Sequence, residues 1–135
     1  MYKNPRQNLP ILCLVSNERG TGKTSLLDLL QVLFAENTVI VGNEQMTSKF
    51  NTLIAGRLCV GVDESNLADN KAFTEKLKYW STAKRLPMEG KGKDATMVDN
   101  FTKYILCSNN ETRFIYASDE EVRFWVRKVP QFAEG

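Results

Sequence analysis

The chain has 135 residues, of which 42% are hydrophobic and 25% are charged. This composition and length are typical of a soluble globular protein with one core. No apolar run approaches the roughly 20 residues that a membrane-spanning helix needs. The first residues also lack the apolar stretch of a signal peptide, so we expect a cytoplasmic protein. The net charge of +2 is too small to indicate a nucleic-acid partner, and any basic patch must be local.

Three cysteines occur, at positions 13, 59 and 107, and the chain has no histidine. An odd number of unclustered cysteines is unlike a disulfide framework, and the usual zinc ligands are missing. Each cysteine lies in an apolar run. We therefore expect Cys13, Cys59 and Cys107 to be small core residues.

Apolar runs alternate with segments of helical periodicity along the chain. The runs predict five strands, at residues 11–15, 38–41, 58–62, 103–107 and 124–126. The periodic segments predict helices over residues 22–34, 43–55 and 70–82. This alternation predicts an α/β fold with a mainly parallel five-stranded sheet flanked by helices. We expect one domain over residues 1–135, with a polar lead-in at 1–9.

Two of the predicted helices have clear apolar stripes that we expect to face the sheet. In the first, the stripe consists of Leu26, Leu27, Leu30, Leu33 and Phe34. In the last, it consists of Phe73, Leu77 and Trp80. Between residues 83 and 100 the periodicity fades and glycine and lysine become frequent, which by itself predicts a solvated loop.

A polar turn joins the first strand to the first helix. The turn and the helix start read Asn17, Glu18, Arg19, Gly20, Thr21, Gly22, Lys23, Thr24 and Ser25. A glycine-containing turn that opens a helix with Gly-Lys-Thr is typical of a phosphate-binding loop, because backbone N–H groups and the helix N-terminus favour an anion there. Lys23 would sit near the outer phosphates, and the Thr24 hydroxyl would ligate Mg²⁺. The alternative is a chance pattern in a polar turn.

Two carboxylates follow the third predicted strand. Because the carboxyl ends of parallel strands meet at one edge of a sheet, Asp63 and Glu64 should lie near the glycine-containing turn. Asp63 would then hold Mg²⁺, and Glu64 would orient or deprotonate an attacking water. The alternative is that both acids simply begin a solvated loop.

Asn109 follows the fourth predicted strand at the same edge. Its neutral amide can hydrogen-bond an attacking water or a γ-phosphate without altering the charge of the site. The alternative is an ordinary turn, because Ser-Asn-Asn sequences are common in turns.

These motifs, in this order, resemble the ATPase core of superfamily 3 helicases, and most closely the helicase half of phage and poxvirus-type primase-helicases. The resemblance extends over about residues 9–129. It implies an AAA+-like P-loop NTPase in a three-layer sandwich, with ATP and Mg²⁺ as ligands and a homo-oligomer, a hexamer in the full-length protein. It also implies a viral or mobile-element source, and hence the host cytoplasm.

Two further features gain meaning from the resemblance. The family has a helix followed by a lysine-bearing segment and a hairpin, and residues 77–94 look similar. Lys91 and Lys93 would then bind the phosphates of a single-stranded nucleic acid, DNA rather than RNA being the first choice. The family also has an arginine finger that acts on the neighbouring subunit's ATP, and Arg123 matches it, with Arg113 and Arg127 as alternatives.

The resulting prediction is an ATP-hydrolysing motor that translocates on single-stranded nucleic acid, with Lys23, Glu64, Asn109 and Arg123 as catalytic residues. A stand-alone phosphotransferase, such as a nucleotide kinase, needs the same loop. It also needs an arginine-bearing lid, which the sequence does not offer. A nucleotide-binding assembly module with little turnover is the third possibility.

Overall fold

In the computed structural model, the residues described are 9–17, 21–42, 54, 56–63, 71–88, 96–109 and 123–130. Most of the predicted helix over residues 43–55 lies outside these ranges. So do Glu18, Arg19, Gly20, Glu64, Lys91, Lys93 and Arg113. No helix within the described ranges is long and apolar enough to cross a membrane.

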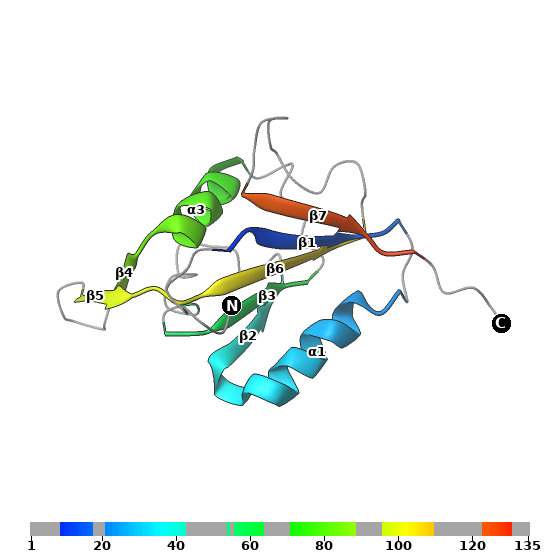
Figure 1. Cartoon of the computed structure of the whole chain (residues 1–135), viewed down its shortest axis with the longest axis horizontal. Coiled ribbons are helices and arrows are strands. Elements are labelled where there is room, and N and C mark those ends of the chain that lie inside the picture. Colours follow the sequence, from blue (N-terminus) through cyan, green and yellow to red (C-terminus); the bar gives the residue numbers. More distant parts are fainter. Residues whose placement is uncertain are drawn as a thin grey trace.

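The five predicted strands form one sheet (Figure 1). They are β1 (Ile11–Val15), β2 (Thr38–Val41), β3 (Cys59–Val62), β6 (Lys103–Ser108) and β7 (Phe124–Lys128). Their order is β2-β3-β6-β1-β7, and all neighbouring strands run parallel. The α/β fold with a mainly parallel sheet is confirmed.

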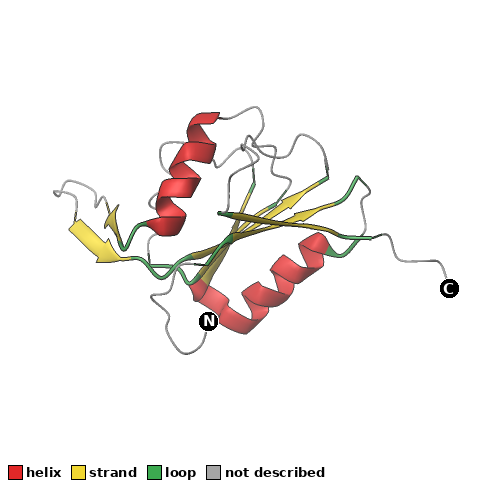
Figure 2. Ribbon diagram, turned by 45° about the horizontal axis from the view of Figure 1, so that its top comes forward, coloured by secondary structure: helices red, strands yellow, loops and turns green. Residues whose placement is uncertain are grey.

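Helices cover both faces of this sheet. Helix α1 (Lys23–Phe34) and helix α3 (Lys71–Thr82) lie on opposite sides of it (Figure 2). Along β3, Val60 and Val62 belong to the core cluster beneath α3, whereas Gly61 faces Leu27 of α1. Coverage on both faces explains why β3 is buried throughout, as strands of parallel sheets often are.

The main core lies between the sheet and α3. Its buried members are Ile11, Cys13, Val15, Val41, Ile54, Val60, Val62, Phe73, Leu77, Trp80, Leu86, Tyr104 and Leu106. The predicted stripe of α3 is therefore confirmed, and the rings of Phe73 and Trp80 meet edge to face at 5.9 Å. All three cysteines are buried free thiols, as expected for core residues.

The predicted stripe of α1 is only partly correct. Leu27 is fully buried, whereas Leu33 is 63% exposed. With 3.6 residues per turn, Leu33 lies about 120° around the helix from Leu27. The sheet covers a narrower arc of α1 than the apolar residues span, so Leu33 and the neighbouring Leu29 and Val32 are exposed.

The close approach of α1 to β3 depends on Gly61. A Cβ atom at this position would come within 2.7 Å of a Leu27 methyl carbon, and Leu27 is enclosed on all sides. We expect Gly61→Ala to lower the free energy of unfolding by about 1–3 kcal/mol, the usual cost of overpacking. Gly42→Ala is the matched control, because a Cβ at Gly42 meets nothing within 4 Å. Equal denaturation midpoints for the two variants would contradict this account.

A second, two-stranded sheet follows α3. Strands β4 (Arg85–Met88) and β5 (Thr96–Asp99) pair antiparallel. Figure 1 shows this hairpin extending from the end of the main sheet that is opposite the start of α1. The loss of periodicity had predicted a loop here, so that interpretation was wrong. The hairpin implied by the family resemblance is present, and Lys91 and Lys93 fall in the sequence between its strands.

Burial raises the pKa of all three thiols, and the values for Cys13 and Cys107 are raised far above the usual one. Loss of solvation, followed by the neighbouring Cys107, raises the pKa of Cys13 from 9.0 to about 12. Loss of solvation, followed by the charge of Asp63, likewise raises the pKa of Cys107 to about 12. The folded-state pKa of each thiol lies above the unfolded value of 9.0, so the thiols contribute stability below pH 9.0. This contribution is lost as the pH rises toward the folded-state pKa values.

We therefore expect the thermal midpoint to fall between pH 8 and pH 10, with each thiol contributing roughly 1 kcal/mol of the loss. Cys107→Ala should show a shallower decline over the same interval when both proteins are followed by circular dichroism. Identical pH profiles for the variant and the wild type would contradict the assignment.

Candidate nucleotide-binding site

The glycine-containing turn begins where β1 ends, between β6 and the edge strand β7. The Ser16 N–H donates to the Ser108 carbonyl at 3.1 Å, so the exit from β1 is bound to the end of β6. Gly22 then adopts a φ of 88°, a left-handed conformation that favours glycine, and α1 begins at Lys23. Gly22 has no side chain to cap the helix, which leaves backbone N–H groups of the first turn available to an anion.

Lys23 is enclosed at the start of α1. Only 7% of its surface is exposed, and its Nζ donates to the Thr21 hydroxyl at 2.8 Å. Thr21 is itself 4% exposed. A lysine held in this way is placed beside the N-terminal N–H groups of the helix, so positive charge and backbone donors are concentrated in one place.

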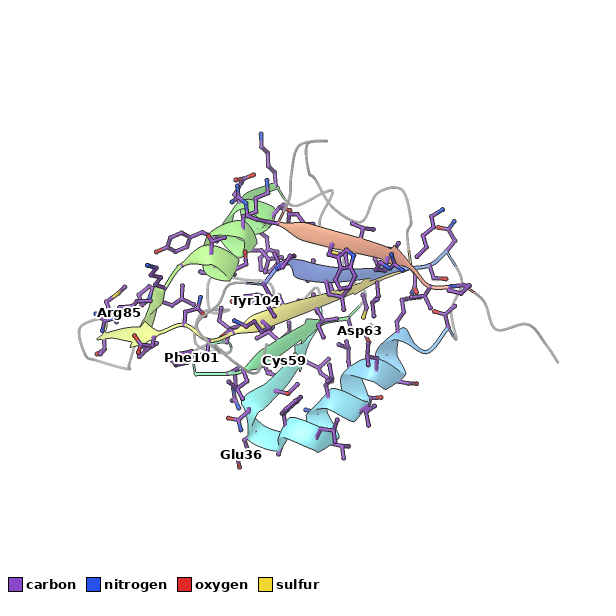
Figure 3. The ribbon with its side chains drawn as sticks, viewed as in Figure 1. Glu36, Cys59, Asp63, Arg85, Phe101 and Tyr104 are labelled. Carbon is purple, nitrogen blue, oxygen red and sulfur yellow. The ribbon has the colours of Figure 1, made fainter. Side chains whose placement is uncertain are left out.

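Asp63, directly after β3, lies beside Thr24 in the first turn of α1. The Thr24 hydroxyl lies 3.3 Å from both carboxylate oxygens of Asp63, although 39 positions separate the two residues. The Asp63 N–H donates to the Val41 carbonyl at 2.9 Å, which fixes the carboxylate at the end of β3. Figure 3 shows Asp63 at the end of the sheet nearest the start of α1, whereas Cys59 and Tyr104 lie toward the other end.

This pair fits the requirements of Mg²⁺. The ion takes oxygen ligands in an octahedron at 2.0–2.1 Å, which places neighbouring ligands about 3 Å apart. A hydroxyl and a carboxylate oxygen separated by 3.3 Å are close to that spacing. Thr24 and Asp63 are therefore the described residues that can hold the metal.

The end of β6 lies next to the start of α1. The Cys107 thiol lies 3.9 Å from the Lys23 carbonyl, and its pKa responds to the charges of both Asp63 and Lys23. Ser108 is level with Val15, and Asn109 follows it, half-buried, at the same edge as the turn. The sequence had identified Cys107 only as a core residue, because nothing local indicates that it lies beneath the turn.

Two of the three candidate finger arginines, Arg123 and Arg127, lie toward opposite ends of β7. Arg123 precedes the strand, and its carbonyl accepts from the Ile11 N–H at 2.6 Å, at the start of β1. Five strand residues at about 3.3 Å each place it roughly 16 Å from the end of β1 where the turn begins. Arg127 is level with Leu14, exposed, and its guanidinium lies 5.8 Å from the centre of the Trp125 ring.

The fold and this site define an α/β protein whose parallel strands bring a lysine, a threonine, an aspartate and an asparagine to one edge. A family of unknown function, DUF5906, matches residues 14–124. Because that match covers most of the sequence, the chain belongs to this family.

The chain is also similar to a phage protein. It is 26% identical over 125 residues to the DNA primase-polymerase of Nitratiruptor phage NrS-1, a match that covers 90% of this chain and 17% of the relative. One apo structure of the NrS-1 C-terminal region, an A form, has a TM-score of 0.74 at 27% identity, and covers 97% of this chain and 30% of its own length. A second apo structure of this region has a TM-score of 0.79 at 26% identity, and the match covers 96% of this chain and 31% of the other.

These likenesses establish homology to the C-terminal region of the NrS-1 protein. The chain spans about a third of that region and about a sixth of the whole relative.

Proposed function

We propose that this chain is the ATP-hydrolysing core of a replicative helicase that acts on single-stranded nucleic acid. The observation that carries the proposal is the meeting of Thr24 with Asp63 beside the enclosed Lys23. P-loop NTPases bind a nucleoside triphosphate and Mg²⁺ with a lysine and a hydroxyl at the start of a helix and a nearby carboxylate.

The topology supports a ligand at this edge. Strand β1 lies between β6 and β7, and the chain leaves it through α1 to reach β2 at the far side of the sheet. In open parallel sheets, ligands bind outside the carboxyl ends of the strands where successive connections diverge. The turn after β1, Asp63 after β3 and Asn109 after β6 all lie at such ends.

In the proposed reaction, the turn and Lys23 bind the β- and γ-phosphates. Asn109 and Glu64 orient the attacking water in line with the bond to be broken. Mg²⁺ held by Thr24 and Asp63 would supply charge neutralisation at the phosphate oxygens. Arg123 lies too far along the sheet to reach the turn of its own subunit, which supports its assignment as a finger for a neighbouring copy in a ring.

Similarity to a DNA primase-polymerase supports a role in DNA replication. The hairpin of β4 and β5 supports the assignment of a nucleic-acid contact to Lys91 and Lys93, which lie in the sequence between its strands. Lysines bind phosphates without reading sequence, so the contact should weaken steeply as the salt concentration rises.

Steady-state ATP hydrolysis, measured at several protein concentrations with and without oligo(dT), tests the proposal. We expect turnover per subunit to rise with protein concentration, because the finger comes from another copy, and to rise again when oligo(dT) is added. Turnover independent of both would overturn the motor and favour a phosphotransferase. Nucleotide binding without turnover would favour an assembly module.

A further inference from the structure

The hairpin of β4 and β5 is held to the rest of the molecule at its base. Among the described residues, its strands pair only with each other. A lone two-stranded hairpin is marginally stable in water, so its direction has to be set by its attachments. Leu86 provides one attachment, because it is 5% exposed and belongs to the main core.

Asn100 provides the polar attachment, directly after β5. Its side-chain NH₂ donates to the Trp80 carbonyl and to the Ala83 carbonyl, both at 2.7 Å. Its side-chain oxygen accepts from the Thr102 N–H at 3.2 Å, and its own N–H donates to the Lys84 carbonyl at 2.9 Å. Asn100 is 8% exposed, so these bonds are shielded from water.

These bonds join three parts of the chain. The carbonyls of Trp80 and Ala83 are at the end of α3, where acceptors outside the regular helix pattern are commonly bonded by side chains. Lys84 is where the chain enters β4, and Asn100 is where it leaves β5. Asn100 therefore joins all three parts: its side chain fixes the helix end to the exit from β5, and its backbone N–H holds the entry to β4.

The same segment leads directly to the nucleotide site. The Thr102 hydroxyl donates to the Arg57 carbonyl at 2.7 Å, and the Lys103 N–H donates to the Leu58 carbonyl at 2.9 Å. These bonds attach the start of β6 to the segment that precedes β3. Strand β6 then runs straight from the hairpin root to Asn109, and β3 runs to Asp63.

We propose that Asn100 is a positioning residue that couples the nucleotide state at Asn109 and Asp63 to the hairpin. The inference rests on the proposed function, in which the hairpin contacts single-stranded nucleic acid. A strand paired on both sides moves as a unit. If the Asn109 end of β6 shifts with the nucleotide, the shift therefore reaches the hairpin only if the hairpin is fixed to the Lys103 end of β6. Asn100 makes that connection.

The test is thermodynamic linkage. The dissociation constant for labelled oligo(dT) is measured by fluorescence anisotropy with a non-hydrolysable ATP analogue and again with ADP. Coupled sites of this kind differ by about fivefold or more between the two states. Asn100→Asp keeps the shape of the side chain but replaces the NH₂ donor with oxygen, which repels both carbonyls. We expect its ratio of dissociation constants to fall to within about twofold of one.

Thr82→Ala is the matched control. The Thr82 hydroxyl also donates to carbonyls near the end of α3, those of Lys78 and Tyr79, and both of these bonds stay within the helix. It should keep the wild-type ratio. Both variants should keep ATP turnover without oligo(dT) within about twofold of wild type, because neither touches the nucleotide. Asn100→Ser, which retains one donor, is the second variant if Asn100→Asp does not fold.

A residue with a merely structural role would weaken oligo(dT) binding equally in both nucleotide states and leave the ratio intact. That result, or an unchanged ratio with unchanged affinities, would overturn the proposal for Asn100 alone. Wild-type protein that hydrolyses ATP but shows no difference between the states would also overturn it. Wild-type protein with no turnover at all would overturn the proposed function first.

Discussion

Replacement of Lys23 by alanine is expected to lower ATP turnover by at least about a hundredfold, the usual loss when a fixed electrostatic partner of a reacting phosphate is removed. Lys23 is enclosed at the start of α1 and bonded to Thr21, so its charge is held in place beside the turn. Asp63→Asn should cause a loss of similar size, because it removes the carboxylate that meets Thr24. Turnover is measured by phosphate release at saturating ATP and Mg²⁺.

Lys76→Ala is the control for Lys23→Ala. It removes the same charge from an exposed position on α3, far from the turn, and should leave turnover within about twofold of wild type. Because ATP that binds the folded state stabilises it, the thermal midpoint of wild-type protein should rise with ATP, and that of Lys23→Ala should rise less. Equal turnover in the wild type and Lys23→Ala would exclude this edge of the sheet as the catalytic site.

Replacement of Arg123 by alanine is expected to lower turnover by about a thousandfold or more, as removal of arginine fingers does. Arg123 sits beside Ile11 at the start of the sheet, whereas Lys23 and Asp63 are at the end, so in the proposed ring it would act on the site of another subunit. Arg127→Ala is the comparison, because Arg127 is the alternative finger within β7, and its guanidinium lies 5.8 Å from the centre of the Trp125 ring. It should remain within about twofold of wild type.

Mixing two inactive variants tests the direction of this contact. Lys23→Ala keeps an intact finger, and Arg123→Ala keeps an intact turn. In a head-to-tail ring assembled from equal amounts, about a quarter of the interfaces combine an intact turn with an intact finger. Turnover should therefore return to roughly that fraction on mixing. Failure to recover activity, in a mixture whose subunits co-assemble, would contradict a finger supplied by a neighbour.

Local patterns were sufficient for much of the fold. The inner strands β1, β3 and β6 were visible as short apolar runs because strands buried on both faces have little room for polar residues. The turn at Gly22 was visible because its glycine, lysine and threonine occur within a few neighbouring positions. The hairpin was not visible from periodicity, since β4 and β5 are short and border a segment rich in glycine and lysine. Only the family resemblance indicated it.

The burial of α1 could not be predicted in full from local sequence patterns. The sequence places Leu33 on the same apolar side as Leu27, but the width of the covered arc depends on how closely the helix approaches the sheet. That approach is set by Gly61, on a strand far along the chain. The exposure of Leu33 is therefore a property of the packed structure.

By itself, the sequence determined the five strands of the main sheet, the buried cysteines and the residue types of the candidate site, because each is encoded within a few neighbouring positions. Only the tertiary structure decided which of these residues meet. It brought Thr24 to Asp63, placed Cys107 beneath Lys23, and put Arg123 at the opposite end of the sheet. It also made Asn100 the root of the hairpin. These relations follow from strand order and register, which arise from packing of the whole chain and which no local segment contains.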